Sequence, residues 1–274
     1  MIIIGKLDFE TTFIVKVTLI IAIRNNLFAL FNLINKKIME SGYPIQQILE
    51  RYDVRDTHLV YHLSEMESIL RNSDFISVLL KMFEEEGYFP EEELNRFPLD
   101  VIIDYISRTH RYYLSKKLPE IEQSIELLLR DYYDNHPLLF LLQNFYAKYR
   151  NGLTHHIQDE EKILLPYVQW LMQESRGKCN TASFLLHFKK YSVGKSIETH
   201  SDTEGDLQEV RETIRQYNPP VTNLTPYRIL LTQLQFLEKD LSVHAIIEDR
   251  ILVPRAIKLE DTLTERLTLL TKLN

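Results

Sequence analysis

Residues 156–166 read His-Ile-Gln-Asp-Glu-Glu-Lys-Ile-Leu-Leu-Pro, and residues 244–254 repeat the pattern as His-Ala-Ile-Ile-Glu-Asp-Arg-Ile-Leu-Val-Pro. Both stretches fit His-x3-Glu-x2-Ile-Leu-x-Pro. The pair Thr109-His110 recurs as Thr199-His200 at nearly the same separation along the chain. A His and a Glu four residues apart share one face of an α-helix, so each copy presents an imidazole and a carboxylate in the same direction. Two copies that face each other are therefore able to hold two metal ions.

Four long amphipathic segments carry these motifs. They cover roughly residues 98–131, 137–172, 181–217 and 225–258. Short polar or proline-containing stretches separate them, and no β-alternation of useful length interrupts them. Only seven glycines in 274 residues also favour helix over a turn-rich β fold. The pattern predicts an all-α four-helix bundle, in which Pro119, Pro166 and Pro254 kink a helix or mark its final turns.

The candidate ligands lie on the apolar stripe of each segment. In the fourth segment the stripe runs through Leu230, Leu234, Leu237, Leu241, His244, Glu248 and Ile251. In the second segment it runs through Leu142, Tyr146, Tyr149, Leu153, His156, Glu160, Ile163 and Tyr167. His110 and His200 hold the same kind of position in the first and third segments. In all four helices a histidine therefore stands where the core of a bundle calls for an apolar residue.

Burial of these polar groups requires compensation. A buried polar group without a partner costs roughly 2–7 kcal/mol, and a buried unpaired carboxylate costs far more. The stripe offers no cationic side chain, so a pair of metal cations would remove the penalty and convert it into binding energy. The alternative is that each histidine is an ordinary core or surface residue. That interpretation suits any one of them alone, but not four helices with two matched glutamates.

Other histidines do not meet this test. His155 is rotated by about 100° from His156, and we expect it to face outward. His187 lies in an apolar stretch and is interpreted as a packing or surface residue. His58, His62 and Glu65 have helical ligand spacing but lie outside the bundle and have no partner copy. On spacing alone, His136 before Pro137 is equally an N-cap or a ligand.

Composition narrows the classes of function. The net charge of −7 argues against a nucleic-acid partner. The single cysteine, Cys179, excludes an internal disulfide and a Cys-rich metal or iron–sulfur site, and it suits a reducing cytoplasm. Any metal must then be held by nitrogen and oxygen. The sequence lacks the Glu-x-x-His pair of ferritin-like bundles and the zinc-protease motif, while an imidazole-rich set favours Fe, Zn or Cu.

The N-terminal part of the chain is expected to precede the bundle as two short regions. Residues 39–97 read as a small helical region, and residues 98–260 as the bundle. Residues 1–38 are either an N-terminal segment or untranslated sequence, with Met39 as the start of translation. Their longest apolar run, residues 17–23, is far below the ~20 residues that a membrane span needs, and no signal-peptide cleavage site is evident. We expect a cytoplasmic protein without a membrane partner.

These motifs resemble those of hemerythrin-type (HHE cation-binding) proteins, most closely the di-iron iron–sulfur cluster repair family. The resemblance covers about residues 98–260, with the order His, His, His-x3-Glu, His, His-x3-Glu. It implies the metal ligands His110, His136, His156, Glu160, His200, His244 and Glu248. It also implies two non-haem Fe ions, bridged by both glutamates and by an oxo or hydroxo group, with at least one exchangeable position.

The resemblance leaves three functions open. The favoured one is iron supply to, or repair of, iron–sulfur proteins damaged by oxidative or nitrosative stress, with no catalytic residue and a metal-binding role rather than that of a turnover enzyme. The second is an O2- or NO-binding hemerythrin for storage or sensing. The third is turnover of NO or peroxide at the same centre.

Two departures from the family bear on the choice. The N-terminal Cys-Cys module is missing, since residues 50–58 read Glu-Arg-Tyr-Asp-Val-Arg-Asp-Thr-His. Gly152 and Thr199 also stand near the third and fourth histidines, where family members tend to carry acidic residues. An iron-release route lined by those carboxylates is therefore less secure than the metal site itself.

Overall fold

The computed structural model describes residues 47–48, 50–52, 72–85, 87–131, 137–177, 191–193 and 224–272. The chain divides into two compact units, residues 1–84 and residues 85–274. In the first unit, helix α4 spans Ser73–Glu84, and Asp74 in its first turn complements the positive end of the helix dipole. The predicted domain limits of 1–38, 39–97 and 98–260 remain predictions.

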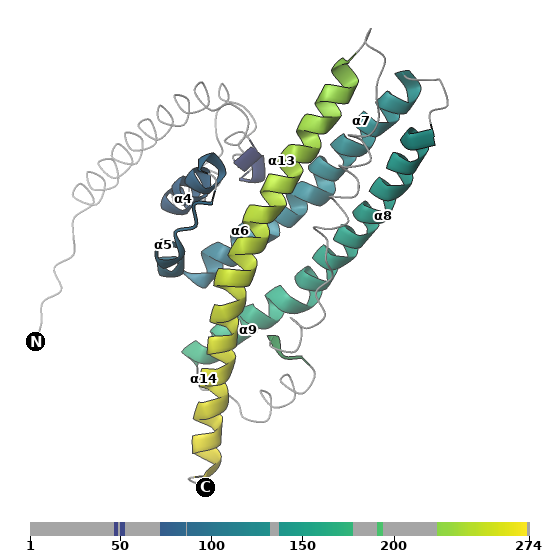
Figure 1. The fold of residues 1–274 in the computed structure, drawn as a ribbon. Coiled ribbons are helices and arrows are strands. Elements are labelled where there is room, and N and C mark those ends of the chain that lie inside the picture. Colours follow the sequence, from purple (N-terminus) through teal and green to yellow (C-terminus); the bar gives the residue numbers. More distant parts are fainter. Residues whose placement is uncertain are drawn as a thin grey trace, which may run out of the picture. The chain divides into compact units, whose positions relative to one another are not determined.

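The second unit is built from helices alone in its described part. The short α5 spans Glu91–Arg96. Three long helical stretches follow, each made of two α-helices joined by a five-residue π-helical turn. They are α6 (Leu99–Tyr112), η1 (Tyr113–Lys117) and α7 (Leu118–Asp131); α8 (Pro137–Asp159), η2 (Glu160–Leu164) and α9 (Leu165–Arg176); and α13 (Thr225–Ile247), η4 (Glu248–Leu252) and α14 (Val253–Lys272). The all-α prediction is confirmed, and these helices fit a hemerythrin-like bundle (Figure 1).

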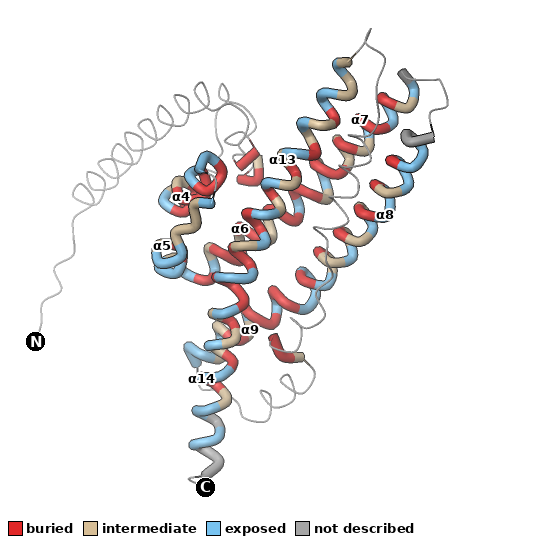
Figure 2. The backbone as a smooth tube through the Cα atoms, in the orientation of Figure 1, coloured by how far each residue is buried: buried red, intermediate tan, exposed pale blue. Residues whose placement is uncertain are grey.

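The long helices pack side by side. Helix α13 contacts α7, α14 contacts α9, and α7 contacts α8. The buried residues form stripes along the facing sides of the helices (Figure 2). One buried cluster joins α7, α8 and α13 and includes Ile121, Ile125, Leu128, Leu142, Tyr146, Leu153, Leu230, Leu234 and Leu237. Burial of each such aliphatic side chain stabilises the fold by about 1.5–3 kcal/mol. The apolar residues that recur every three to four positions in the sequence therefore hold the bundle together.

Polar contacts fix individual helices within this unit. The hydroxyl of Tyr146 on α8 donates to the carbonyl of Leu118 at the start of α7, at 2.6 Å. Arg255 on α14 donates to the carbonyl of Phe97 at 2.8 Å, next to the end of α5. These contacts tie neighbouring stretches of chain close to the π-helical turns.

A proline follows each π-helical turn by two residues, at Pro119, Pro166 and Pro254. Proline has no N–H and its ring clashes with the carbonyl four residues earlier, so a regular α-helix cannot pass through it undisturbed. A wider turn just before the proline relieves this conflict, and each helix then continues. The backbone stays in the right-handed helical region at the junctions, for example at Glu248 with φ −66° and ψ −55°. The interpretation that the prolines mark final turns is therefore wrong, and the last helix runs on to Lys272, past the predicted end at 258.

The π turn also changes which residues face the core. Ile163 was predicted on the stripe, but its side chain is 45% exposed, whereas Leu164 is buried at 4% exposure. One residue more per turn rotates the following side chains, so the stripe moves by one position. In the second copy both Ile251 and Leu252 are buried. The third predicted segment, 181–217, lies outside the described residues except for 191–193.

Among the described helices, none is both long and apolar enough to cross a bilayer.

Candidate metal centre

Five of the seven predicted ligands lie in the described part of the chain, close to the π-helical turns. His110 lies near the end of α6, His156 near the end of α8, and His244 near the end of α13. Glu160 and Glu248 are the first residues of η2 and η4. The other two predicted ligands, His136 and His200, lie outside the described residues, as do His58, His62, Glu65 and His187.

The five side chains form two groups that share one carboxylate. The first group is His110, Glu160 and His244; the second is His156, Glu160 and Glu248. In each group, one potential ligand atom per residue lies within 4.8 Å of the others. Glu160 faces both histidines at once, because Oε2 lies 3.1 Å from His110 Nε2 and Oε1 lies 2.9 Å from His156 Nε2. A carboxylate placed in this way has the geometry of a bridge between two ions.

The remaining distances bring the two copies of the motif together. His244 Nε2 lies 3.3 Å from His110 Nε2 and 3.6 Å from Glu248 Oε2. Two imidazole nitrogens and the carboxylates therefore converge on one small region from α6, η2, α13 and η4. The prediction that both copies point inward agrees with this burial: Glu160 is 3% exposed and Glu248 is 4% exposed. His155, by contrast, is exposed, as predicted.

The two glutamates differ in their electrostatics. Burial by itself raises the pKa of Glu160, but the adjacent imidazoles of His110 and His156 outweigh burial and hold that pKa far below its usual range. Burial raises the pKa of Glu248 well above its usual range, and the negative charge of nearby Glu160 raises it further. Two carboxylates this close resist simultaneous ionisation unless positive charge is added.

This donor set fits a pair of divalent cations. It offers imidazole nitrogens and carboxylate oxygens, which suit Fe, Zn and Cu. Glu248 Oε1 is buried and has no hydrogen-bond donor among the described residues. A cation bound here would supply the charge that lets both glutamates ionise and would satisfy that oxygen. On chemical grounds, the residues fit the metal centre that the sequence predicts.

Several residues around the site were missed by the sequence-based reasoning. Glu161 Oε1 lies 2.8 Å from His110 Nδ1. The rings of Tyr113 and Tyr105 lie 5.9 Å and 6.5 Å from the His244 ring, between centroids. Tyr113 precedes Pro119 by the same six residues that separate Glu160 from Pro166, which is a signal that the sequence does carry. The predicted ligands therefore have two aromatic rings and one further carboxylate as neighbours.

Two fully buried charged residues, Asp240 and Lys117, were also missed. Asp240 lies one helical turn before His244, so extending the stripe in the same four-residue step would have found it. Lys117 corrects the expectation that the core offers no cation. The groups that lower the pKa of Glu160 are nonetheless the two histidines.

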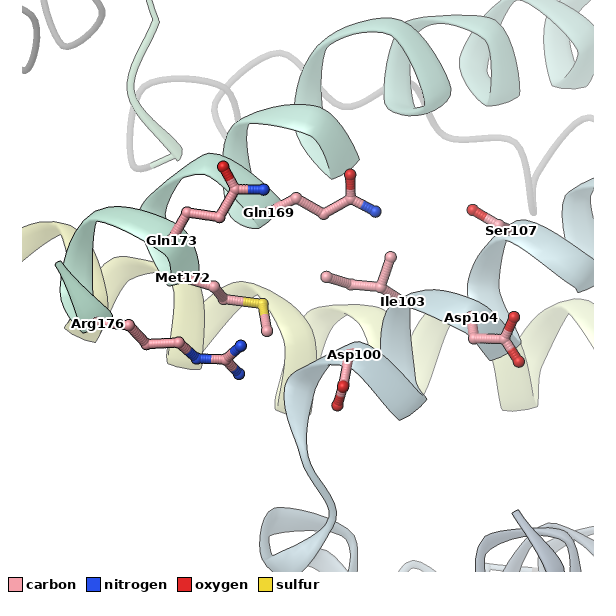
Figure 3. Close-up of a pocket in the computed structure, with 8 residues that line it drawn as sticks. All are labelled: Asp100, Ile103, Asp104, Ser107, Gln169, Met172, Gln173 and Arg176. Carbon is pink, nitrogen blue, oxygen red and sulfur yellow. The ribbon is translucent and has the colours of Figure 1, made fainter. Parts of the chain in front are cut away.

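A surface pocket of about 310 Å³ lies between α6 and α9, and no predicted ligand lines it (Figure 3). Asp100, Asp104 and Ser107 contribute from α6, while Gln169 and Gln173 contribute from α9. Asp104 is paired with Arg108 at 2.8 Å. Ser107 also lines this pocket.

Comparison with known proteins adds independent information. No protein-family model matches the chain. The iron-sulfur cluster repair protein ScdA of Staphylococcus haemolyticus is 24% identical over 151 residues, which are 55% of this chain and 64% of that protein. The iron-sulfur cluster repair protein YtfE of Dickeya chrysanthemi is 27% identical over 159 residues, 58% of this chain and 66% of that protein. YtfE of Escherichia coli O81 is 25% identical over 169 residues, 61% of this chain and 70% of that protein. The chain thus spans slightly less than two thirds of the first two relatives.

Proposed function

We propose that this chain, a hemerythrin-like relative of the iron–sulfur cluster repair proteins, is a non-haem di-iron protein that repairs, or supplies iron to, clusters damaged by oxidative or nitrosative stress. The observation that carries the proposal is the position of Glu160, with one oxygen toward His110 and the other toward His156. Cluster repair is the proposed role because the similar proteins are named iron-sulfur cluster repair proteins. Its partners would be damaged iron–sulfur proteins, and the reducing cytoplasm is the compartment that a chain with the lone Cys179 suits.

The ligand sets follow from the two groups of side chains. His110, His244 and Glu160 would hold one ion, while His156, Glu248 and Glu160 would hold the other. His136 and His200 are the proposed remaining ligands, and an oxo or hydroxo bridge completes the proposed centre. With five imidazoles for two ions, one ion keeps a position for O2, NO or peroxide. Bound iron would supply redox chemistry and affinity for these small molecules.

The chain's own residues would prepare the site for this role. Both glutamates are held within the bundle core, so solvent water has little access to them. Tyr105 and Tyr113 pack beside His244 and restrict the room on that side. Glu161 accepts a hydrogen bond from Nδ1–H of His110, and Nε2 faces Glu160.

A second candidate function is an O2- or NO-binding hemerythrin for storage or sensing. The aromatic rings beside His244 favour it, since apolar surface next to a metal ligand suits a diatomic molecule better than a large polar substrate. Reversible O2 binding by the reduced protein, followed in the visible spectrum, would support this alternative. Many turnovers of NO or peroxide without loss of iron would instead support an enzyme.

Iron transfer to an apo iron–sulfur protein tests the main proposal. The reduced, iron-loaded chain is incubated anaerobically with the apo protein, and cluster formation is followed by absorbance. We expect transfer by the wild type and none by Glu160→Ala, because the shared ligand is lost. His155→Ala is the matched control, since it removes an exposed imidazole next to His156. Equal transfer by wild type and Glu160→Ala would refute the proposal.

A further inference from the structure

We infer that Glu161 is a positioning residue for the metal centre, because its carboxylate holds the Nδ1–H of His110. The inference rests on the proposed function, because it concerns how one ligand of that centre is oriented. Glu161 was not among the predicted ligands, and its carboxylate lies on the side of the imidazole that faces away from Glu160.

The geometry shows one imidazole held between two consecutive carboxylates. His110 Nε2 lies 3.1 Å from Glu160 Oε2, and His110 Nδ1 lies 2.8 Å from Glu161 Oε1. The ring comes from α6 and both carboxylates come from η2. His110 is 1% exposed, so the ring has no freedom to reorient toward solvent.

The π-helical turn explains how two neighbouring residues reach the same ring. In an α-helix consecutive side chains diverge by about 100°, which would turn one of the two carboxylates away. A π turn has more residues per turn, so neighbours diverge less. Pro166 enforces that turn. In the first copy of the motif, Glu160 therefore faces the metal centre and Glu161 faces one of its ligands.

The chemistry of the contact fixes where the proton lies. An ionised carboxylate only accepts hydrogen bonds, so Nδ1 must donate to Glu161. Glu160 Oε2 lies 3.1 Å from Nε2 but receives no well-aligned hydrogen bond from the described residues, so the contact at Nδ1 is the one that fixes the proton. With the proton on Nδ1, Nε2 keeps the lone pair that a metal ion needs. A carboxylate behind a metal-binding imidazole sets its tautomer and its orientation.

The contact can be tested by mutation because Glu161 lies at the edge of the bundle. Its side chain is 39% exposed, and substitutions at such positions seldom unfold a domain. Glu122 on α7 is a matched control: it also forms an interhelical ion pair, with Arg150 on α8, but it does not contact the ligands. Glu122→Ala removes the same charge and an interhelical contact of the same kind.

Two measurements on the full chain test the inference. The first uses ¹⁵N NMR of the imidazoles in metal-free protein, at a pH at which the His110 ring is neutral, and reports which nitrogen carries the proton. We expect the Nδ1–H tautomer in the wild type and in Glu122→Ala. Glu161→Ala should lose this preference, because no acceptor remains at Nδ1. An unchanged tautomer in Glu161→Ala overturns the inference, whether or not the chain binds iron.

The second measurement is affinity for Co²⁺, obtained by competition with a chelator. We expect about 10–100-fold weaker binding of one ion in Glu161→Ala, the usual effect of losing such a partner. Glu161→Asp should lose a similar amount, because the charge remains but the shorter side chain does not reach Nδ1. Wild-type affinity in Glu161→Asp would show that charge alone matters and would overturn the positioning role. A wild type that binds fewer than two ions would instead refute the proposed function.

Discussion

Glu160 and Glu248 occupy the same position in two copies of one motif, yet their environments shift their pKa values in opposite directions. Glu160 lies between His110 and His156, which stabilise its negative charge. Glu248 is just as buried, but its neighbour is the charge of Glu160 rather than a second imidazole. The motif determines which position of a helix carries the carboxylate. The residues on the neighbouring helices determine the pKa of that carboxylate.

The largest expected difference between the two copies is in metal content. Glu160 belongs to both ligand groups, whereas Glu248 belongs to one. We expect Glu160→Ala to lose both ions and Glu248→Ala to keep about one, the ion held by His110 and His244. Iron per chain after anaerobic reconstitution and desalting measures this difference. Equal iron content in the two variants would contradict the proposal that Glu160 binds both ions and Glu248 only one.

The second difference concerns packing in the π-helical turns. Leu164 is buried and Ile163 is 45% exposed, whereas Ile251 and Leu252 are both fully buried. We expect Leu164→Ala, Ile251→Ala and Leu252→Ala each to lower the free energy of unfolding by about 2–5 kcal/mol. Ile163→Ala should change it by no more than about 0.5 kcal/mol. Urea unfolding of the metal-free proteins gives these values, and a large loss in Ile163→Ala would contradict the shifted stripe.

The smallest expected difference is in the pH dependence of stability of the metal-free protein. The pKa of Glu160 is lowered from 4.5, so its stabilisation is present above that pH and is lost as the pH falls below it. The pKa of Glu248 is raised from 4.5, so its burial destabilises the fold progressively as the pH rises above that value. The raised pKa of His110 adds a loss of stability as the pH rises above 6.5.

Two neutral variants separate these effects. Glu160→Gln should flatten the acidic side of the stability profile, and Glu248→Gln should flatten the side above pH 4.5. Thermal unfolding across a pH series is sufficient to see the two slopes. The same change of slope in both variants would mean that the two glutamates are electrostatically equivalent, and it would contradict the opposite pKa shifts.

The helical pattern was enough to predict the bundle and the inward direction of His110, His156, Glu160, His244 and Glu248. Each of them continues a stripe of apolar residues, and that periodicity is a property of the chain itself. The change from Ile163 to Leu164 was not predictable in the same way, because a constant helical period was assumed through Pro166. A proline stands six residues after both Glu160 and Glu248 in the sequence, but only the structure shows that the turn before it widens.

The contact of Glu161 was out of reach for a different reason. In a regular helix the residue after Glu160 points away from the core, so the periodicity gives its carboxylate no inward role. Only the position of α6 shows that the His110 ring extends far enough to meet it. Contacts between segments distant in sequence depend on how the helices pack, and spacing within one segment does not contain that information.

Metal content of the full chain, purified without chelator, tests the proposed di-iron centre most directly. We expect about two irons per chain in the wild type, because two groups of ligands share Glu160. Tightly bound zinc, a single ion or no metal at all would contradict a di-iron centre.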